Sequence, residues 1–413
     1  MTNLSAIIAP TNVVTTTGTQ TLSNKTLTSP TLTGAAMNGT VGATTASTGA
    51  FTSISSTLGI NTPNTFGFKN RIINGEMVID QRNAGVSYTQ VNGGFSLDRW
   101  SGNSFDGGAA TNKFSVIQSS TAPTGFSKSL LVTSLAATAD GASNIFNIEQ
   151  KIEGFNFADF AYGTASAQTL TLSFWVRSSL TGTFGGALKN SARNRAYPFT
   201  YTISSANTFE QKTITITGDT TGTWVGGTNG VGLWVSFGLG VGSTYSGTAG
   251  AWGGGDVFSA TSATSVVGTN GATWYITGVQ LEKGSTATSF DVRPYTTELQ
   301  LCQRYYYKII ALSGTSGVNI LQASFYQSSS GYAAVVLPVA MRANPTGSYS
   351  AVADFYVGSN GAYTVLTSIT ANNGYASSNL IEFYWFTGGG TIGFSGFIRI
   401  NNTSGWLAYS AEL

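Results

Sequence analysis

The sequence contains no histidine, and this absence removes much of the familiar catalytic chemistry. Ser-His-Asp and Cys-His nucleophile systems need an imidazole base, and His-based metal sites need its nitrogens. Paired carboxylates remain, because glycoside cleavage needs only two of them about 5–10 Å apart. The candidates for such a pair are Asp98, Glu149, Glu153, Asp159 and Asp256. We expect most of these acids to solvate the surface or to pair with arginines, and we predict that the protein is not an enzyme.

Aromatic side chains offer a second kind of chemistry, the stacking of sugar rings. A sugar ring presents C–H faces that pack on aromatic rings, while nearby amide or guanidinium groups satisfy its hydroxyls. The residues that we predict to bind glycan in this way are Trp252, Tyr245, Trp385, Trp175 and Arg177. Trp252 stands beside a run of three glycines, where we expect too few apolar neighbours to bury it. For each single ring, packing in a core or between subunits is the alternative.

Cofactor and metal motifs are weak in this sequence. Residues 238–243 hint at a dinucleotide loop, but Ser243 stands where the third glycine belongs and no helix pattern follows. Asp98 or Asp291 could serve a structural calcium near a strand end, yet the sequence has no Asp-rich loop. We therefore predict no cofactor and no metal.

Composition limits the fold class and the partners. Only 9% of the 413 residues are charged, 52 are glycine and 12% are aromatic, which suits short strands joined by tight turns. The fold class is therefore predicted to be all-β. A net charge of +2 gives no electrostatic footprint for nucleic acid, and no run reaches the length of a membrane span. The single cysteine, Cys302, is expected to be a small buried hydrophobe.

The chain divides into three predicted parts. Residues 1–66 are rich in Thr, Ser and Gly, with leucines at 22, 27 and 32, and we predict a fibrous stalk. One such chain cannot bury enough apolar surface to fold, whereas three wound together could, so we predict a homotrimer. Residues 67–296 alternate strands and turns and predict a jelly-roll β-sandwich. Residues 297–413 predict a second antiparallel β-sandwich, opened by a short helix at 297–305.

Within the middle part, several runs of β-branched and aromatic residues predict individual strands. They lie at 113–118, 129–133, 145–152, 170–177, 199–203, 211–217, 232–237 and 274–281. In the fourth run, Leu170, Leu172, Phe174 and Val176 alternate with polar or half-polar residues and should face the core. Asn74-Gly75 between short apolar runs predicts a hairpin.

Three stretches resemble a known family. Residues 278–295 resemble the closing strand and tail of jelly-roll carbohydrate-binding modules, and resemble even more the same segment of tailed-bacteriophage fibre proteins. The phage proteins are also similar at 70–83 with 97–100, and at 297–306. Together these stretches cover the edges of one large domain. The sequence of residues 1–66 resembles the stalk repeats of phage tail fibres.

The resemblance implies a tail fibre or receptor-binding fibre of a virion, made in the host cytoplasm without a signal peptide. Its implied partners are other tail, baseplate or capsid proteins, bound through the stalk, and host surface polysaccharide. Two alternatives stay open. One is a capsular polysaccharide depolymerase that uses two of the acids named above, and the other is a purely structural fibre on the head or baseplate.

Overall fold

The computed structural model describes residues 67–107, 109–139, 141–311, 317–359, 361–371 and 377–413. All of them belong to one compact unit that spans Thr62–Leu413. This part of the chain is all-β, as predicted, and α1 (Tyr295–Gln303) is its one α-helix among the described residues. None of the helices in these ranges combines the length and apolar character needed to cross a membrane. The predicted stalk, and the trimer that it would form, lie outside the described residues.

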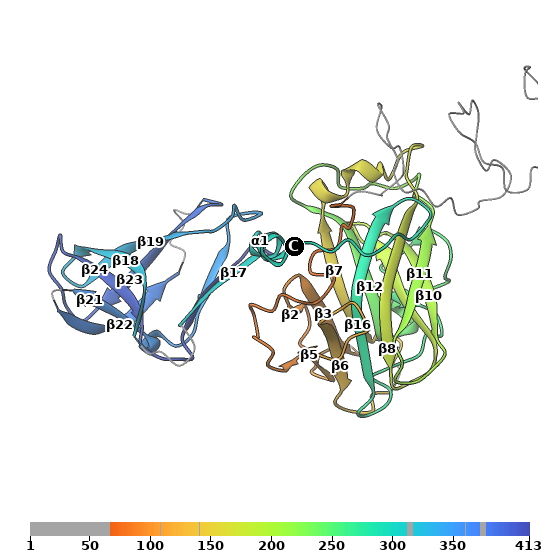
Figure 1. Cartoon of the computed structure of the whole chain (residues 1–413), viewed down its shortest axis with the longest axis horizontal. Coiled ribbons are helices and arrows are strands. Elements are labelled where there is room, and N and C mark those ends of the chain that lie inside the picture. The colour runs from red at the N-terminus through yellow and green to blue at the C-terminus, as the bar shows by residue number, and fades with distance from the viewer. Residues whose placement is uncertain (1–66, 108, 140, 312–316, 360, 372–376) are drawn as a thin grey trace, which may run out of the picture. The chain divides into compact units, whose positions relative to one another are not determined.

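Two antiparallel sheets make up the first β region (Figure 1). The six-stranded sheet has the order β1 (Tyr88–Thr89), β5 (Phe114–Ser119), β6 (Ser129–Ser134), β16 (Thr273–Lys283), β8 (Leu170–Ser178) and β11 (Glu210–Ile216). The eight-stranded sheet has the order β14 (Gly253–Gly254), β10 (Arg195–Ile203), β9 (Gly182–Lys189), β12 (Val231–Val241), β7 (Ile145–Glu153), β3 (Trp100–Asp106) and β2 (Gly94–Leu97), with β4 (Ala109–Ala110) beside β3. The smaller elements here are β13 (Ser246–Gly247), β15 (Ser259–Ala260) and the 3-10 turns η2 (Gly154–Asn156), η3 (Ala158–Phe160) and η4 (Ser243–Tyr245).

The core between these sheets follows the period-two alternation of the strands. On β8, Leu170, Leu172, Phe174 and Val176 are fully buried, which confirms the predicted inward face. Trp175 and Arg177 point to the other side and stay partly exposed. The strand β9, with its sequence GTFGGALK, was not predicted because its glycines weaken the strand pattern.

The predicted hairpin around Asn74-Gly75 is wrong. The chain makes a turn there, with Asn74 at a positive φ of 58°, but no strand flanks it. The Asn74 side chain makes two hydrogen bonds to the backbone of Ile79. Its Nδ2 donates to the Ile79 carbonyl at 2.8 Å, and its Oδ1 accepts from the Ile79 N–H at 2.9 Å. These side-chain bonds take the place of a strand ladder.

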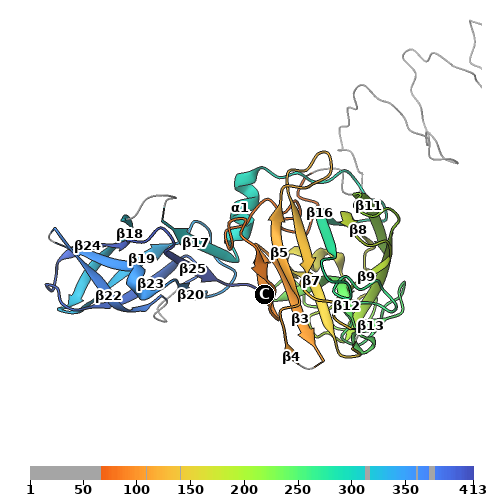
Figure 2. The same cartoon turned by 90° about the horizontal axis from the view of Figure 1, so that it is seen from below.

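The chain after α1 builds a three-stranded sheet and a closed barrel, the latter visible in Figure 2. The sheet has the order β17 (Tyr306–Ile310), β25 (Trp406–Ser410) and β20 (Thr346–Tyr349). The barrel runs β18 (Val318–Gln327), β19 (Ser330–Val336), β23 (Leu380–Thr387), β22 (Ala362–Thr370), β21 (Phe355–Ser359) and β24 (Ser395–Ile400), with η5 (Val352–Asp354) before β21.

Six strands after α1 close into a barrel, whereas a second antiparallel β-sandwich was predicted. The antiparallel strands were expected, but β21 and β22 were not. These two strands bridge the edges that would otherwise stay open, since β22 pairs with β23 and β21 pairs with β24. Closure leaves none of the six strands with an unpaired edge. The barrel has its own apolar core, separate from that of the first region. The predicted boundary between domains at 296–297 stays a prediction.

Candidate functional site

The stretches that carry the family resemblance meet at one polar junction in the fold. Asp98 accepts hydrogen bonds from the backbone N–H of Gln81 at 2.7 Å and from its side chain at 2.5 Å. Glu298, in α1, accepts a hydrogen bond from the backbone N–H of Asn74 and pairs with Arg293 at 3.0 Å. These motif residues therefore bond one another, and their role in the fold is structural.

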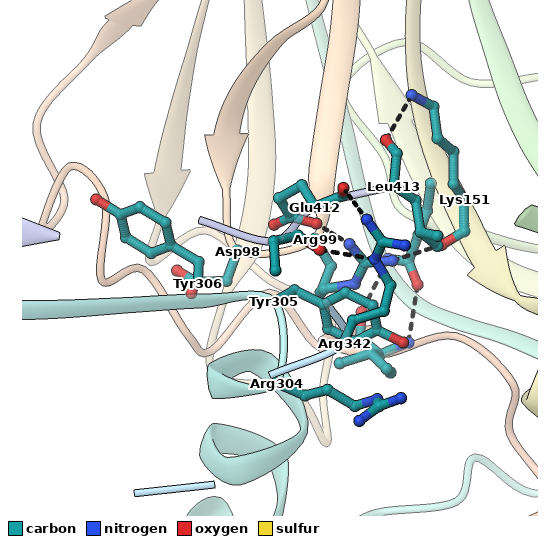
Figure 3. Close-up of polar contacts among 12 residues, drawn as sticks. Asp98, Arg99, Lys151, Arg304, Tyr305, Tyr306, Arg342, Glu412 and Leu413 are labelled. Atoms are coloured by element: carbon teal, nitrogen blue, oxygen red, sulfur yellow. Dashed lines mark hydrogen bonds and ion pairs between the residues drawn. The ribbon is translucent and has the colours of Figure 1, made fainter. Parts of the chain in front are cut away.

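Figure 3 shows the centre of this junction, where the last residues of the chain pack against β7. The carboxylate of Glu412 pairs with Arg99 and, at 2.6 Å, with Arg82. The Arg99 guanidinium lies 3.6 Å from the ring centroid of Tyr305. Burial lowers the pKa of both Arg82 and Arg99, because the interior disfavours the charged form. Charge is thus concentrated here in buried pairs centred on Glu412.

Glu153 anchors the other side of the junction. It accepts two hydrogen bonds from Arg304, at 2.6 and 2.9 Å, and one from the Tyr305 hydroxyl at 2.6 Å. Burial acts to raise the pKa of Glu153, but the hydrogen bonds from Arg304 and Tyr305 outweigh it and hold the pKa below its usual range. A carboxyl held in this way is a structural anion and lacks the raised pKa of a general acid.

The remaining candidate carboxylates also have partners. Asp98 is fully buried, and burial raises its pKa. Glu149 accepts a hydrogen bond from Asn147 at 3.0 Å, and Asp159 pairs with Arg71 at 2.8 Å. Asp256 pairs with Lys189 at 2.9 Å and with Arg193 at 2.5 Å. Within the described ranges, no group of three or more Cys, Asp or Glu could hold a metal ion.

Trp252 belongs to an aromatic cluster at the edge of the sandwich. Its ring meets Tyr162, Tyr197 and Trp224 edge-on, at centroid distances of 5.7, 5.3 and 5.4 Å. Its indole N–H donates to the carbonyl of Thr217 at 2.7 Å. The expectation concerned neighbours within its own glycine-rich loop, whereas the rings that pack on Trp252 come from distant segments of the chain. Its role as a sugar platform stays a prediction for a ring that is only partly exposed.

Tyr245 ends the short turn η4 and is also partly exposed. Its ring meets Phe258 edge-on at 6.0 Å. The segment around Phe258 lies on the outer face of the eight-stranded sheet, where a Cβ at Gly185 or Gly238 would meet Ser259 at 2.5 Å. Glycines at these positions are needed for this close approach. This part of the sheet face is therefore filled by the chain itself.

Trp385 is not a surface platform, and that prediction is wrong. Its side chain is 0% exposed and meets Phe325 edge-on at 4.7 Å in the barrel core. Strand alternation explains the error, because the two neighbours of an inward residue on a strand point outward. Tyr384 and Phe386 are those neighbours, and both are accessible on the outside of β23. The prediction therefore named a residue of β23 that faces the core, whereas Tyr384 and Phe386 on the same strand face outward.

A row of four aromatic rings crosses the outside of the barrel. Tyr326 on β18 meets Tyr332 on β19 at 5.3 Å, and Tyr332 meets Tyr384 on β23 at 4.8 Å. Tyr384 then meets Phe386 at 4.8 Å. Tyr326 is 60% exposed and Phe386 is 37% exposed. The row therefore exposes aromatic surface to solvent. A hollow lies next to it on the barrel surface.

The hollow is an open groove of about 730 Å³ on the outer face of β18, β19 and β23. Its polar lining includes Gln322, Ser324 and Glu382, and its apolar lining includes Val336 and Leu380. Strand register sets this composition: Tyr332 pairs with Tyr384, and Val336 pairs with Leu380. We call this surface, together with the aromatic row, the barrel groove. Rings, amide and carboxylate groups side by side are the chemistry that sugar binding uses.

Sequence reasoning missed the barrel groove. The signal was present as the alternation of Tyr326 with Phe325, and of Tyr384 and Phe386 with Trp385. What the sequence lacked was the pairing that sets these strands next to one another.

Trp175 and Arg177 stand together on the outer face of the six-stranded sheet, as predicted from β8. Gln211 lies opposite Trp175 on β11, and Tyr275 lies opposite Arg177 on β16. The Arg177 guanidinium is 4.9 Å from the ring centroid of Tyr275. Glycan binding by this face stays a prediction.

Comparisons with known proteins give distant structural matches. No protein-family profile matches the chain, and no curated protein matches it. Among solved structures it is similar to the enzymatically active domain of tailspike protein 4 from bacteriophage CBA120, at 14% identity over 52% of this chain and 22% of that chain, with a TM-score of 0.29. It is also similar to a family 11 carbohydrate-binding module from Clostridium thermocellum, at 8% identity over 49% of this chain and 99% of that one, with a TM-score of 0.26.

Proposed function

We propose that this chain is a virion fibre protein of a tailed bacteriophage and that it attaches the particle to glycan on the host cell surface. The barrel groove is the proposed glycan site. The observation that carries the proposal is the aromatic row of Tyr326, Tyr332, Tyr384 and Phe386 beside a groove with both polar and apolar lining. The assignment to a phage fibre is supported by the sequence resemblance at 70–100 and 278–306.

We assign stacking and hydrogen-bonding roles to different parts of the barrel groove. A pyranose ring packs its C–H face on the exposed ring of Tyr326, at one end of the row. The exposed side chains of Gln322 and Ser324 exchange hydrogen bonds with the sugar hydroxyls. Such bonds replace bonds to water at small net gain, so affinity for one site is modest. Several copies on one particle raise the effective affinity through simultaneous engagement.

Binding without cleavage is the proposed activity. The carboxylates that could have formed a catalytic pair are instead held by arginine, lysine or amide partners. Release of reducing sugar from a bound polysaccharide would favour the depolymerase instead. A protein that binds no cell and no polysaccharide would favour the purely structural fibre.

The test is binding of the labelled full chain to a panel of bacterial capsular and O-antigen polysaccharides. Tyr326→Ala should weaken binding to the best polysaccharide by about tenfold, which corresponds to about 1.4 kcal/mol for one stacked ring. Tyr295→Ala is the matched control, because Tyr295 in α1 is also 60% exposed and lies outside the barrel groove. Equal loss in both variants, or no loss in Tyr326→Ala, would contradict the proposal.

A further inference from the structure

The outer face of the six-stranded sheet holds an arginine beside two aromatic rings. Arg177 lies 4.9 Å from the ring centroid of Tyr275 and 5.8 Å from that of Phe209. Tyr275 is its cross-strand neighbour on β16, and Phe209 directly precedes β11. These two rings meet each other edge-on at a centroid distance of 6.0 Å, and both contact the guanidinium as cation–π partners that limit its movement.

Arg177 also lacks a charge partner among the residues that the structure describes. In the described ranges, none of the ion pairs involves Arg177. Its Nε is buried and has no hydrogen-bond partner. By contrast, Arg195 and Arg304 each bind one carboxylate through two hydrogen bonds. A partly exposed guanidinium with no carboxylate partner among the described residues favours an oxyanion as its ligand.

The surroundings of Arg177 suit a sugar as the carrier of that anion. Trp175 stands two residues before it on the same face and is partly exposed. On the flanking strands, Gln211 and Thr277 lie opposite Trp175. Gln211 is exposed and offers an amide to hydroxyl groups. A ring platform and a cation on β8 thus lie next to an amide on the neighbouring strand β11.

We propose that this face is a second glycan site, which takes an anionic sugar whose carboxylate or sulfate pairs with Arg177 while its ring stacks on Trp175. The inference rests on the proposed function in one respect, since it assigns the ligand to the same chemical class. It differs in location and in charge from the barrel groove, which lies on β18, β19 and β23. The second site would let one chain distinguish acidic from neutral polysaccharide.

The experiment compares three sets of oligosaccharides on the full chain by titration calorimetry: uronic acid oligosaccharides, their carboxyl-reduced neutral counterparts, and sulfated oligosaccharides of the same length. The wild-type chain should bind one anionic set at least about tenfold more tightly than the neutral set, because a charge-assisted pair is the stronger bond. Whichever anionic set binds identifies the anion. The preference should shrink as salt is raised.

Two variants locate the site. Arg177→Gln should abolish the preference, and Arg177→Lys should keep only part of it, because lysine lacks the planar fork. Arg399→Gln is the control, since Arg399 is also stacked on a tyrosine, Tyr363, at 4.4 Å, but in the barrel. The control should keep the full preference. If Arg177→Gln fails to fold, the proposal is tested by the wild-type preference for the anionic set and by its partial loss in Arg177→Lys.

The outcomes separate this inference from the proposed function. Equal affinity for all three sets in the wild-type chain overturns the second site alone and leaves neutral binding at the barrel groove in place. A preference that survives in Arg177→Gln, or is lost in Arg399→Gln, also overturns it. Absence of binding to every set also overturns the second site, whereas the proposed function is decided separately by the polysaccharide panel and Tyr326→Ala.

Discussion

The pairing of Glu412 with two arginines leads to a prediction about stability. Its carboxylate lies 2.6 Å from Arg82 and also pairs with Arg99, and all three side chains are largely buried. Glu412→Gln keeps the shape of the side chain and removes its charge. Arg99 would then remain buried with no carboxylate partner among the described residues, and breaking one side of a buried pair costs about 3–5 kcal/mol.

We expect Glu412→Gln to lower the free energy of unfolding by about 3 kcal/mol or more, within that range. Urea unfolding followed by tryptophan fluorescence measures this as a lower midpoint with an unchanged slope. Asp106→Asn is the control, because Asp106 pairs with Lys113 at 3.5 Å and both side chains are about one-third exposed. Such a surface pair contributes about 0–1 kcal/mol.

Hydrogen exchange supplies the second readout of the same prediction. β25 and the residues after it should exchange faster in Glu412→Gln, since the junction that holds them is weakened. If the variant unfolds within about 1 kcal/mol of the wild type, as the surface control does, the reasoning about a buried charge pair is refuted.

Three further predictions concern the barrel core and one buried lysine. Trp385→Ala should lower stability by about 3–5 kcal/mol in urea unfolding, because it empties the barrel core; a stable variant would refute its core role. Gly331→Ala should lower stability by about 1–3 kcal/mol, since a Cβ there would clash with the Ser324 carbonyl and the Trp385 ring; unchanged unfolding would refute the clash. Burial lowers the pKa of Lys189 to about 8, so the unfolded chain binds more protons between about pH 8 and 10.5, and stability should rise with pH by about 3 kcal/mol across that window. Lys189→Met should show a smaller rise, because it loses the contribution of this residue while Lys151 and Lys308, whose pKa values burial also lowers, remain; equal slopes in both proteins would contradict it.

Much of the fold could be predicted from local pattern. The alternation of Leu170, Leu172, Phe174 and Val176 predicted both the strand β8 and its buried face, because the side-chain period of a strand is fixed by its backbone. The helix α1 was predicted within two residues of its observed start and end. The closed barrel could not be predicted, because closure depends on pairings between strands far apart in sequence.

The candidate site was harder to predict than the fold. Composition identified aromatic stacking as the chemistry, but the burial of a given ring depends on tertiary neighbours. Trp252 looked isolated in its glycine-rich loop, yet Tyr162 and Trp224 come from other segments to pack on it. Trp385 is buried because its side chain faces the barrel core, whereas the preceding residue on β23, Tyr384, faces outward and is partly exposed.

The central claim is that the barrel groove binds host glycan, and hydroxyl-radical footprinting tests it without any substitution. The full chain is oxidised with and without the polysaccharide that it binds most tightly in the panel, and modification of each aromatic residue is measured by mass spectrometry. The account predicts protection of Tyr326 and Phe386, with Tyr295 unchanged. Protection confined to Tyr245 and Trp252, with Tyr326 oxidised equally in both samples, would contradict it.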